Sequence, residues 1–313
     1  MNSALNLESS GQATVLGYAH RPVTKAPNWH GLVTLDVLFN NLSTGLFLVA
    51  ALAELVAPTS FAGISRVAFP IALLWLIADL VCLVLDLGDR FRFHHMLRVW
   101  KPSSPMSLGT WCLTAFAAPL TVLAAMSLFP TSSAEWLRRV LLILGLMPAL
   151  GAAVYKGVLF STTAQPGWGN ARWLGGYLSS SALTLGAAQV LVLASAVGHP
   201  GVAEALRRAS MALLVVNLIA LCLLAADLRA PLSRAHTPGG LAGLGALALF
   251  ASTLVPLWLL ALGAPLELSA ALVFMLSGAF LVRHEVVRLP HLIMTAATRQ
   301  GSASRASGPP PSR

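Results

Sequence analysis

The chain has 313 residues, of which 57% are hydrophobic and only 10% are charged, and its mean hydropathy is +0.77. Soluble domains carry roughly 25% charged residues. This composition therefore excludes soluble enzymes, disordered chains and fibrous repeats, and it indicates an integral membrane protein. A net charge of +9 on a soluble protein would suggest a nucleic-acid partner. We expect none here, because the basic residues lie beside apolar runs, as they do in the loops of membrane proteins.

Eight apolar runs are long enough to cross the hydrocarbon core of a bilayer, which takes about 20 helical residues. The runs are continuously apolar, whereas the strands of a membrane barrel would alternate, so helices are predicted. The predicted spans are residues 33–57, 65–86, 107–129, 138–161, 173–197, 208–227, 240–263 and 266–287.

These runs predict an all-α membrane domain over residues 33–287, preceded by a polar segment, 1–32. The stretch LIADLVCLVLDL (76–87) resembles LIALCLLAADL (218–228), which favours an arrangement as two four-helix bundles. The tail 288–313 is expected to be disordered, because its last part is rich in Ser, Pro and Gly.

The basic residues predict the orientation of the chain. An even number of spans puts both termini on one side of the membrane. Fourteen of the 20 Lys and Arg residues fall on that side and five on the other, while Lys156 lies inside the fourth run. Because basic residues are concentrated in cytoplasmic loops, we predict cytoplasmic termini and a location in the inner membrane of the cell.

Several ionisable residues lie inside the predicted spans, where each costs roughly 2.5–3.5 kcal/mol on insertion scales and tends to face the bundle interior. Asp36 and Asn40 are four residues apart and share one helical face, where a carboxylate can hold a proton beside a carboxamide. Asp79 and Lys156 are candidates for a proton path. Glu54 lies near a span end and is expected to extend to the interface. The alternative is that these groups only hydrogen-bond neighbouring helices.

The loop 86–111 contains the densest set of polar residues between two spans. It mixes acidic, basic and aromatic side chains, which suits an ordered surface for docking a partner; the alternative is an ordinary positive-inside loop. The residues predicted to dock a partner are Arg90, Arg92, His94, His95, Arg98 and Lys101.

The Cys and His residues predict that the chain binds no redox cofactor or metal of its own. Cys82, Cys112 and Cys222 show no CxxC spacing and cannot supply four thiolates for a cluster or a zinc site. The histidines all lie in loops or near span ends, so no haem is expected at membrane depth. Any redox role must therefore use the cofactor of a partner.

Three segments resemble the NrfD/PsrC family. LDLGDRFRFHHMLRVWKPSSPMSLGTW (85–111) resembles the loop after the second helix of that family, and SPMS (104–107) with its spaced Arg and Trp is its most specific part. YKGVLFSTTAQPGW (155–168) resembles the segment at the end of the fourth helix, and LSTGLFLVA (42–50) resembles the Gly-containing first-helix motif. The likeness covers roughly residues 30–180, and the second half matches only in helix count.

The resemblance implies an eight-helix subunit without prosthetic groups that reacts with quinone in a respiratory oxidoreductase. Such a subunit exchanges electrons between menaquinone or ubiquinone and a four-cluster ferredoxin-like iron–sulfur subunit. That partner connects to a molybdopterin or multihaem catalytic subunit. Many relatives dock their partners on the outer face, near the start of the first helix, whereas the charge count places that end in the cytoplasm.

The resemblance also assigns residues. By motif position Tyr155 is the quinone-binding tyrosine, and Asp36 occupies a first-helix position where relatives use a histidine or another proton-active residue. We therefore predict a quinone head-group site between the first and fourth helices, near Tyr155, Asp36 and Asn40, with His30 relaying protons from water. Two alternatives remain at this point: a secondary transporter or ion-translocating protein, motivated by the buried charges, and a passive membrane anchor that binds no quinone.

Overall fold

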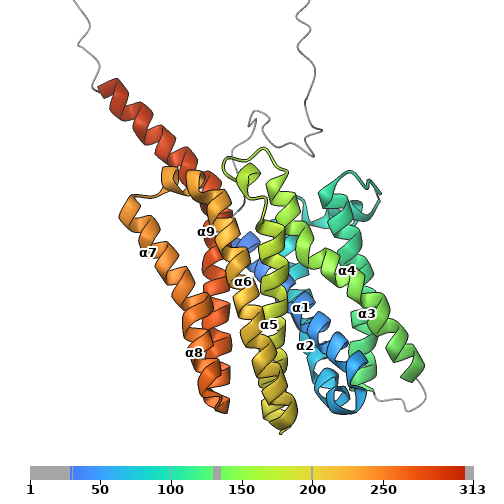
Figure 1. The fold of residues 1–313 in the computed structure, drawn as a ribbon. Coiled ribbons are helices and arrows are strands. Elements are labelled where there is room, and N and C mark those ends of the chain that lie inside the picture. Colours follow the sequence, from blue (N-terminus) through green and yellow to red (C-terminus); the bar gives the residue numbers. More distant parts are fainter. Residues whose placement is uncertain (1–28, 30, 99, 130–134, 199, 307–313) are drawn as a thin grey trace, which may run out of the picture.

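The computed structural model describes residue 29 and the ranges 31–98, 100–129, 135–198 and 200–306 (Figure 1). In these residues, eight helical segments are long and apolar enough to cross a membrane. The prediction of an all-α multi-pass membrane protein is therefore confirmed. A helix pairs the backbone N–H and C=O groups of a span with one another. This pairing is necessary in the hydrocarbon core, because lipid chains offer no hydrogen-bond partners.

The helices follow one another up and down through the bundle. They are α1 (Gly31–Val56), α2 (Pro58–Asp86), α3 (Pro105–Leu128), α4 (Glu135–Ser161), α5 (Leu174–Val197), α6 (Pro200–Ala235), α7 (Pro238–Leu249), α8 (Val255–Leu262) and α9 (Pro265–Ala306). Two short 3-10 helices, η1 (Arg90–Leu97) and η2 (Trp168–Asn170), lie between them. A π-helical turn, η3 (Phe250–Leu254), joins α7 to α8, and these three elements form one span.

Three helices continue well beyond the predicted apolar runs: α2 begins at Pro58 rather than 65, and α6 and α9 are extended as well. α6 begins at Pro200 rather than 208, and its polar first turns are stabilised by Glu204, whose carboxylate lies 2.8 Å from both Arg207 Nε and Arg208 Nε. α9 continues past 287 to Ala306, so residues 288–306 of the predicted tail are helical. This extension is anchored by Leu289, which is fully buried.

The start of α1 and the last part of α9 lie at the same end of the bundle (Figure 1). His291 Nε2 lies 3.1 Å from the backbone oxygen of Trp29, which holds these two distant parts of the chain together. The first and last spans therefore meet on one face, as an even number of crossings requires. We call this face the terminal face.

The two halves of the chain meet along α1 and α5, which are the most buried spans. Gly45 of α1 faces Ala182 and Gly186 of α5 so closely that a Cβ atom added to Gly45 would overlap the Ala182 carbonyl, and one added to Gly186 would overlap the Gly45 carbonyl. Small residues allow backbones to approach in this way in membrane helix pairs, where van der Waals packing drives association. The pair forms the centre of the molecule.

This close approach generates a stability prediction. Gly45→Ala places a methyl group against backbone that cannot move aside, so we expect a loss of about 1–3 kcal/mol in the free energy of unfolding, the usual range for overpacking. The measurement is the midpoint of thermal unfolding in detergent. Gly63→Ala on α2 is the matched control, because an added Cβ there meets nothing within 4 Å. Equal midpoints for the two variants would contradict the packing.

Candidate functional site

A buried ionic cluster joins α1, α2 and α4. Lys156 Nζ lies 2.6 Å from Asp79 Oδ1 and 2.8 Å from Asp36 Oδ1, and it also donates to the Asp36 backbone oxygen at 3.1 Å. The exposed fraction is 0% for Asp79, 3% for Lys156 and 6% for Asp36. The structure therefore brings together three residues that the sequence left in separate spans. We call Lys156, Asp36, Asp79 and Asn40 the Lys156 cluster.

Asn40 completes the cluster, in which two buried acceptors, Asn40 Oδ1 and Asp36 Oδ1, accept no hydrogen bond from a described residue. Its Nδ2 donates to Asp79 Oδ2 at 3.1 Å, so both carboxylate oxygens of Asp79 have a donor. Its Oδ1 is buried and accepts no hydrogen bond from any residue that the structure describes. A buried acceptor without a donor costs free energy. A ligand hydroxyl at this position would remove that cost.

Tyr155 lies beside the cluster but on the α3 side of α4. Its ring packs on Gly109 so closely that a Cβ atom there would overlap the ring. Lys156 Nζ is 5.7 Å from the centroid of the ring, within cation–π range. Adjacent residues on a helix point about 100° apart, which explains why Lys156 faces α1 and α2 while Tyr155 faces α3.

The Lys156 cluster lies near the terminal face. Asp36 is five residues from the start of α1, Lys156 is five from the end of α4, and Asp79 is seven from the end of α2. At about 1.5 Å per residue, the cluster lies roughly 8–10 Å below these helix ends. The segment that contains η1 lies at this same end of the bundle (Figure 1).

Aromatic rings pack one helical turn beyond Lys156, toward the terminal face. Phe160 stacks on Trp168 with ring centroids 4.6 Å apart, and Trp29 lies 5.0 Å from Trp168. Trp168 Nε1 donates to the Val286 backbone oxygen at 2.6 Å, which fixes the segment to α9. These rings therefore pack on the terminal-face side of Lys156.

The two motifs quoted from the sequence have structural roles. Ser104 caps α3 by accepting from Ser107 N at 3.5 Å, and Pro105 follows in the first turn, where its missing N–H costs nothing. Gly109 makes room for Tyr155. Gly167 has a φ of +85°, a conformation that favours glycine, and it turns the chain so that Trp168 enters the core.

The six residues predicted to dock a partner lie in or just after η1, outside the bundle. All of them are exposed: Arg90, Arg92, His94, His95, Arg98 and Lys101. Arg92 Nε lies 2.9 Å from Asp89 Oδ2. The surface is therefore accessible, and its docking role stays a prediction.

A second buried cation, Arg283, was missed because the charge count assigned it to the basic residues on the side of the termini. Its exposed fraction is 2%, its Nη2 donates to Asn41 Oδ1 at 2.6 Å and to Ser181 Oγ at 3.1 Å, and no carboxylate of a described residue pairs with it. Asn41 Nδ2 in turn donates to the Ala153 carbonyl at 3.3 Å. The signal that could have revealed its burial is the apolar pattern of α9, which continues beyond residue 287.

Glu54 was also interpreted wrongly. It does not extend to the interface: its exposed fraction is 6%, and its Oε2 accepts from Arg138 Nη2 at 2.8 Å. Arg138 lies over the Phe69 ring, with Cζ 5.3 Å from the centroid. This bidentate pair joins α1 to α4 at the end opposite the Lys156 cluster, so both ends of this helix pair are held by ionic contacts.

The contacts described above do not test two further predictions, the role of His30 and the absence of a metal or redox cofactor. His30 lies outside the described residues. Among the described residues, no three His, Cys, Asp or Glu side chains gather as metal ligands would. That the chain binds no metal or redox cofactor stays a prediction.

The fold and the Lys156 cluster define a polytopic helical membrane protein with ionisable groups buried near one face. The family described as polysulfide reductase, of the NrfD type, matches residues 18–292, so the chain belongs to this family. The resemblance seen in the motifs is thereby confirmed. Family membership indicates a membrane subunit of a redox complex. A comparison with curated proteins finds no match.

The geometry of the cluster predicts an unequal effect of two substitutions. Lys156→Met leaves two buried carboxylates without a cation, so we expect a loss of about 3–5 kcal/mol in the free energy of unfolding. Asp79→Asn leaves Lys156 paired with Asp36 and should cost clearly less. Denaturant unfolding in detergent measures both values. A larger loss for Asp79→Asn than for Lys156→Met would contradict the arrangement.

Proposed function

We propose that the chain is the quinone-reactive subunit of a multi-subunit respiratory oxidoreductase. It passes electrons between the quinone pool and a four-cluster iron–sulfur subunit, which connects to a molybdopterin or multihaem catalytic subunit. Quinone is an exchangeable substrate, and the chain holds no redox cofactor of its own. The charge count supports an inner-membrane location with the terminal face in the cytoplasm.

The observation that carries the proposal is the charge balance of the Lys156 cluster. Two carboxylates surround one ammonium group, so the cluster is neutral only when it holds one additional proton. An uncompensated charge is costly at membrane depth. The cluster is thus suited to hold a proton and to release it to a bound substrate.

Quinone reduction consumes two electrons and two protons and yields quinol; oxidation runs in reverse. In the proposal the iron–sulfur partner supplies or accepts the electrons. A carboxyl group of the cluster gives one proton to a quinone oxygen, is reprotonated from the terminal face, and gives the second. Groups that transfer protons must lie within hydrogen-bond reach of the reacting oxygen. In the proposal Asn40 Oδ1 helps to hold the quinol there by accepting a hydrogen bond from its hydroxyl.

The contacts of Lys156 bear on how the proposed head group would approach. The space between α1 and α4 at this depth holds the Lys156 side chain and its partners. In the proposal the head group therefore approaches the cluster from the side of α4 on which Tyr155 lies. Tyr155 then donates its hydroxyl proton in a hydrogen bond to one quinone oxygen, while the cluster serves the other.

Substitutions of the residues proposed to contact the two quinone oxygens test this assignment. Asp36→Asn keeps the shape and leaves a neutral Lys156–Asp79 pair, so it should lower kcat for quinol turnover more than it changes KM. Tyr155→Phe removes one hydrogen bond worth about 0.5–1.5 kcal/mol, so the apparent KM should rise several-fold. The measurement is steady-state turnover of a soluble quinol by the purified complex.

The matched control is Tyr177→Phe, which removes the hydroxyl of another buried tyrosine, on α5. Its kinetics should equal those of the unmodified complex. If Asp36→Asn and Tyr155→Phe both assemble and turn over quinol at the unmodified rate, the proposed site is refuted and a passive anchor is favoured.

The exposed basic residues of η1 support docking of the iron–sulfur subunit at the terminal face. Arg90→Glu combined with Arg98→Glu should reduce the amount of partner that co-purifies with the membrane subunit, because like charges at an interface repel. Arg66→Glu with Arg139→Glu makes the same charge change at the opposite end, where both residues are exposed. Equal partner recovery from the two double variants would argue against docking at η1.

A further inference from the structure

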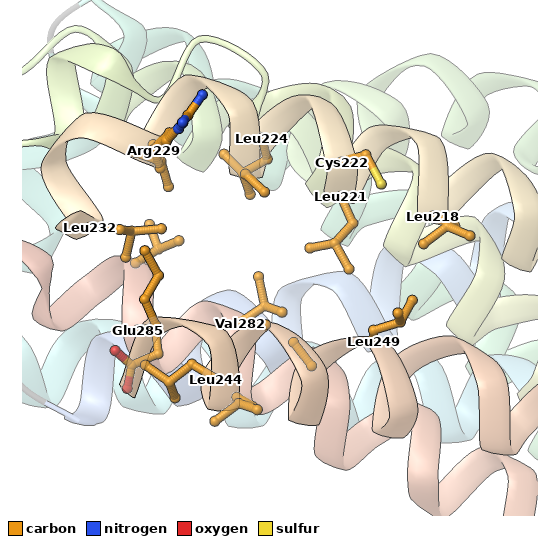
Figure 2. Close-up of a pocket in the computed structure, with 17 residues that line it drawn as sticks. Leu218, Leu221, Cys222, Leu224, Arg229, Leu232, Leu244, Leu249, Val282 and Glu285 are labelled. Atoms are coloured by element: carbon orange, nitrogen blue, oxygen red, sulfur yellow. The ribbon is translucent and has the colours of Figure 1, made fainter. Parts of the chain in front are cut away.

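An apolar groove of about 430 Å³ opens between α6, α7 and α9. Figure 2 shows Leu221 and Leu224 of α6 facing Leu244 and Leu249 of α7 and Val282 of α9 across open space. On α9, the neighbouring Arg283 instead contacts Asn41 of α1. α9 therefore separates the groove from the Lys156 cluster.

α7 is loosely packed against the rest of the described chain. None of its residues is buried, although it belongs to a membrane span. Gly245 lines the groove, and a Cβ atom added there would meet nothing within 4 Å. Glycines in membrane helices usually allow a close approach of another helix. No described helix approaches Gly245 in this way, so the inner side of α7 is open to a ligand.

A polar hollow of about 630 Å³ adjoins the groove toward the terminal face and shares Arg229 and Leu241 with it. Ser233 and His236 also line the hollow. Pro238, the first residue of α7, is another lining residue, so the positive end of this helix dipole adjoins the hollow. The combined space is apolar along its length and polar at one end.

Among the described residues that line the groove and the hollow, Arg229 is the one arginine or lysine, and two carboxylates, Asp227 and Glu285, lie there with it. Asp227 accepts from Arg172 Nη2 at 3.4 Å and from Trp173 N at 2.9 Å. Glu285 lies 3.3 Å from His236 Nε2. Arg229 forms no ion pair with any residue that the structure describes, and the exposed Arg234 lies five residues further along α6.

The position of Arg229 suits the junction between the acyl chain and the headgroup of a lipid. Its aliphatic stem lines the groove, and its guanidinium points out of the apolar space (Figure 2). Long basic side chains at membrane interfaces place their apolar stem and charged end in this way. An anion bound here would lie beside the groove rather than inside it.

We propose that the groove and the hollow together bind one anionic phospholipid, with an acyl chain along the groove and the phosphate at Arg229. Basic sites between membrane helices bind anionic headgroups. The bound chain would cover the inner side of α7 and connect it to α6.

The test is native mass spectrometry of the full chain in mild detergent, titrated with phosphatidylglycerol or with phosphatidylcholine of the same acyl chains. One phosphatidylglycerol should bind about fivefold more tightly, the ratio expected for one basic residue near the surface. Arg229→Gln should abolish this preference. Arg66→Gln, which removes an exposed charge at the opposite end of the bundle, should leave it unchanged.

A second pair of variants tests the groove independently of charge. Gly245→Leu places a side chain in the groove, where an added Cβ meets nothing within 4 Å, and should weaken binding of both lipids; Gly243→Leu, two residues away and not lining the groove, should not. Equal affinity for the two lipids, or undiminished binding by Gly245→Leu, would overturn the proposal. So would displacement of phosphatidylglycerol by an equimolar long-chain menaquinone, which would assign the groove to the quinone tail instead.

Discussion

The ion pairing of Lys156 with two aspartates is the constraint around which the first half of the protein is organised. None of these three side chains can be hydrated by bulk water at its position, so α1, α2 and α4 must bring them to one point. Lys156 can serve both acids because its ammonium group donates to Asp79 Oδ1 and to the Asp36 backbone oxygen and lies 2.8 Å from Asp36 Oδ1. The cluster contains two acids and one base, and this imbalance is the basis of the proposed proton transfer.

The same requirement connects the two halves of the chain. Arg283 of α9 has no acid to pair with in the described residues and donates to neutral acceptors of α1, α5 and its own helix. Asn41 follows Asn40 in the sequence, so two adjacent residues of α1 belong to different polar groups: Asn40 to the Lys156 cluster and Asn41 to the hydrogen bonds of Arg283. The close approach of α1 and α5 at Gly45 and Gly186 makes these contacts geometrically possible. A substitution that alters the packing of α1 on α5 should therefore disturb both the Lys156 cluster and the hydrogen bonds of Arg283.

The two sides of α9 have different roles. The side with Arg283 is buried and polar, and the residues on its other side line an apolar groove beneath a helix that has no buried residue. Tight packing fixes ionisable groups where proton transfer needs defined distances, and loose packing leaves room for lipid. The proposed reactive site thus lies in the most rigidly connected part of the bundle, whereas α7 depends on its surroundings for cover.

The sequence by itself determined the membrane class, the helical spans, the family and the set of ionisable residues, because composition, run length and local motifs are properties of short stretches of chain. It misplaced the ends of α6 and α9, since hydropathy marks the hydrocarbon core and not the helix that continues beyond it. Only the tertiary structure decided that Asp36, Asp79 and Lys156 converge, that Glu54 is buried with Arg138, and that Tyr155 faces α3. Those contacts join residues up to 120 positions apart, and their pairing is set by how helices pack, which no local pattern contains.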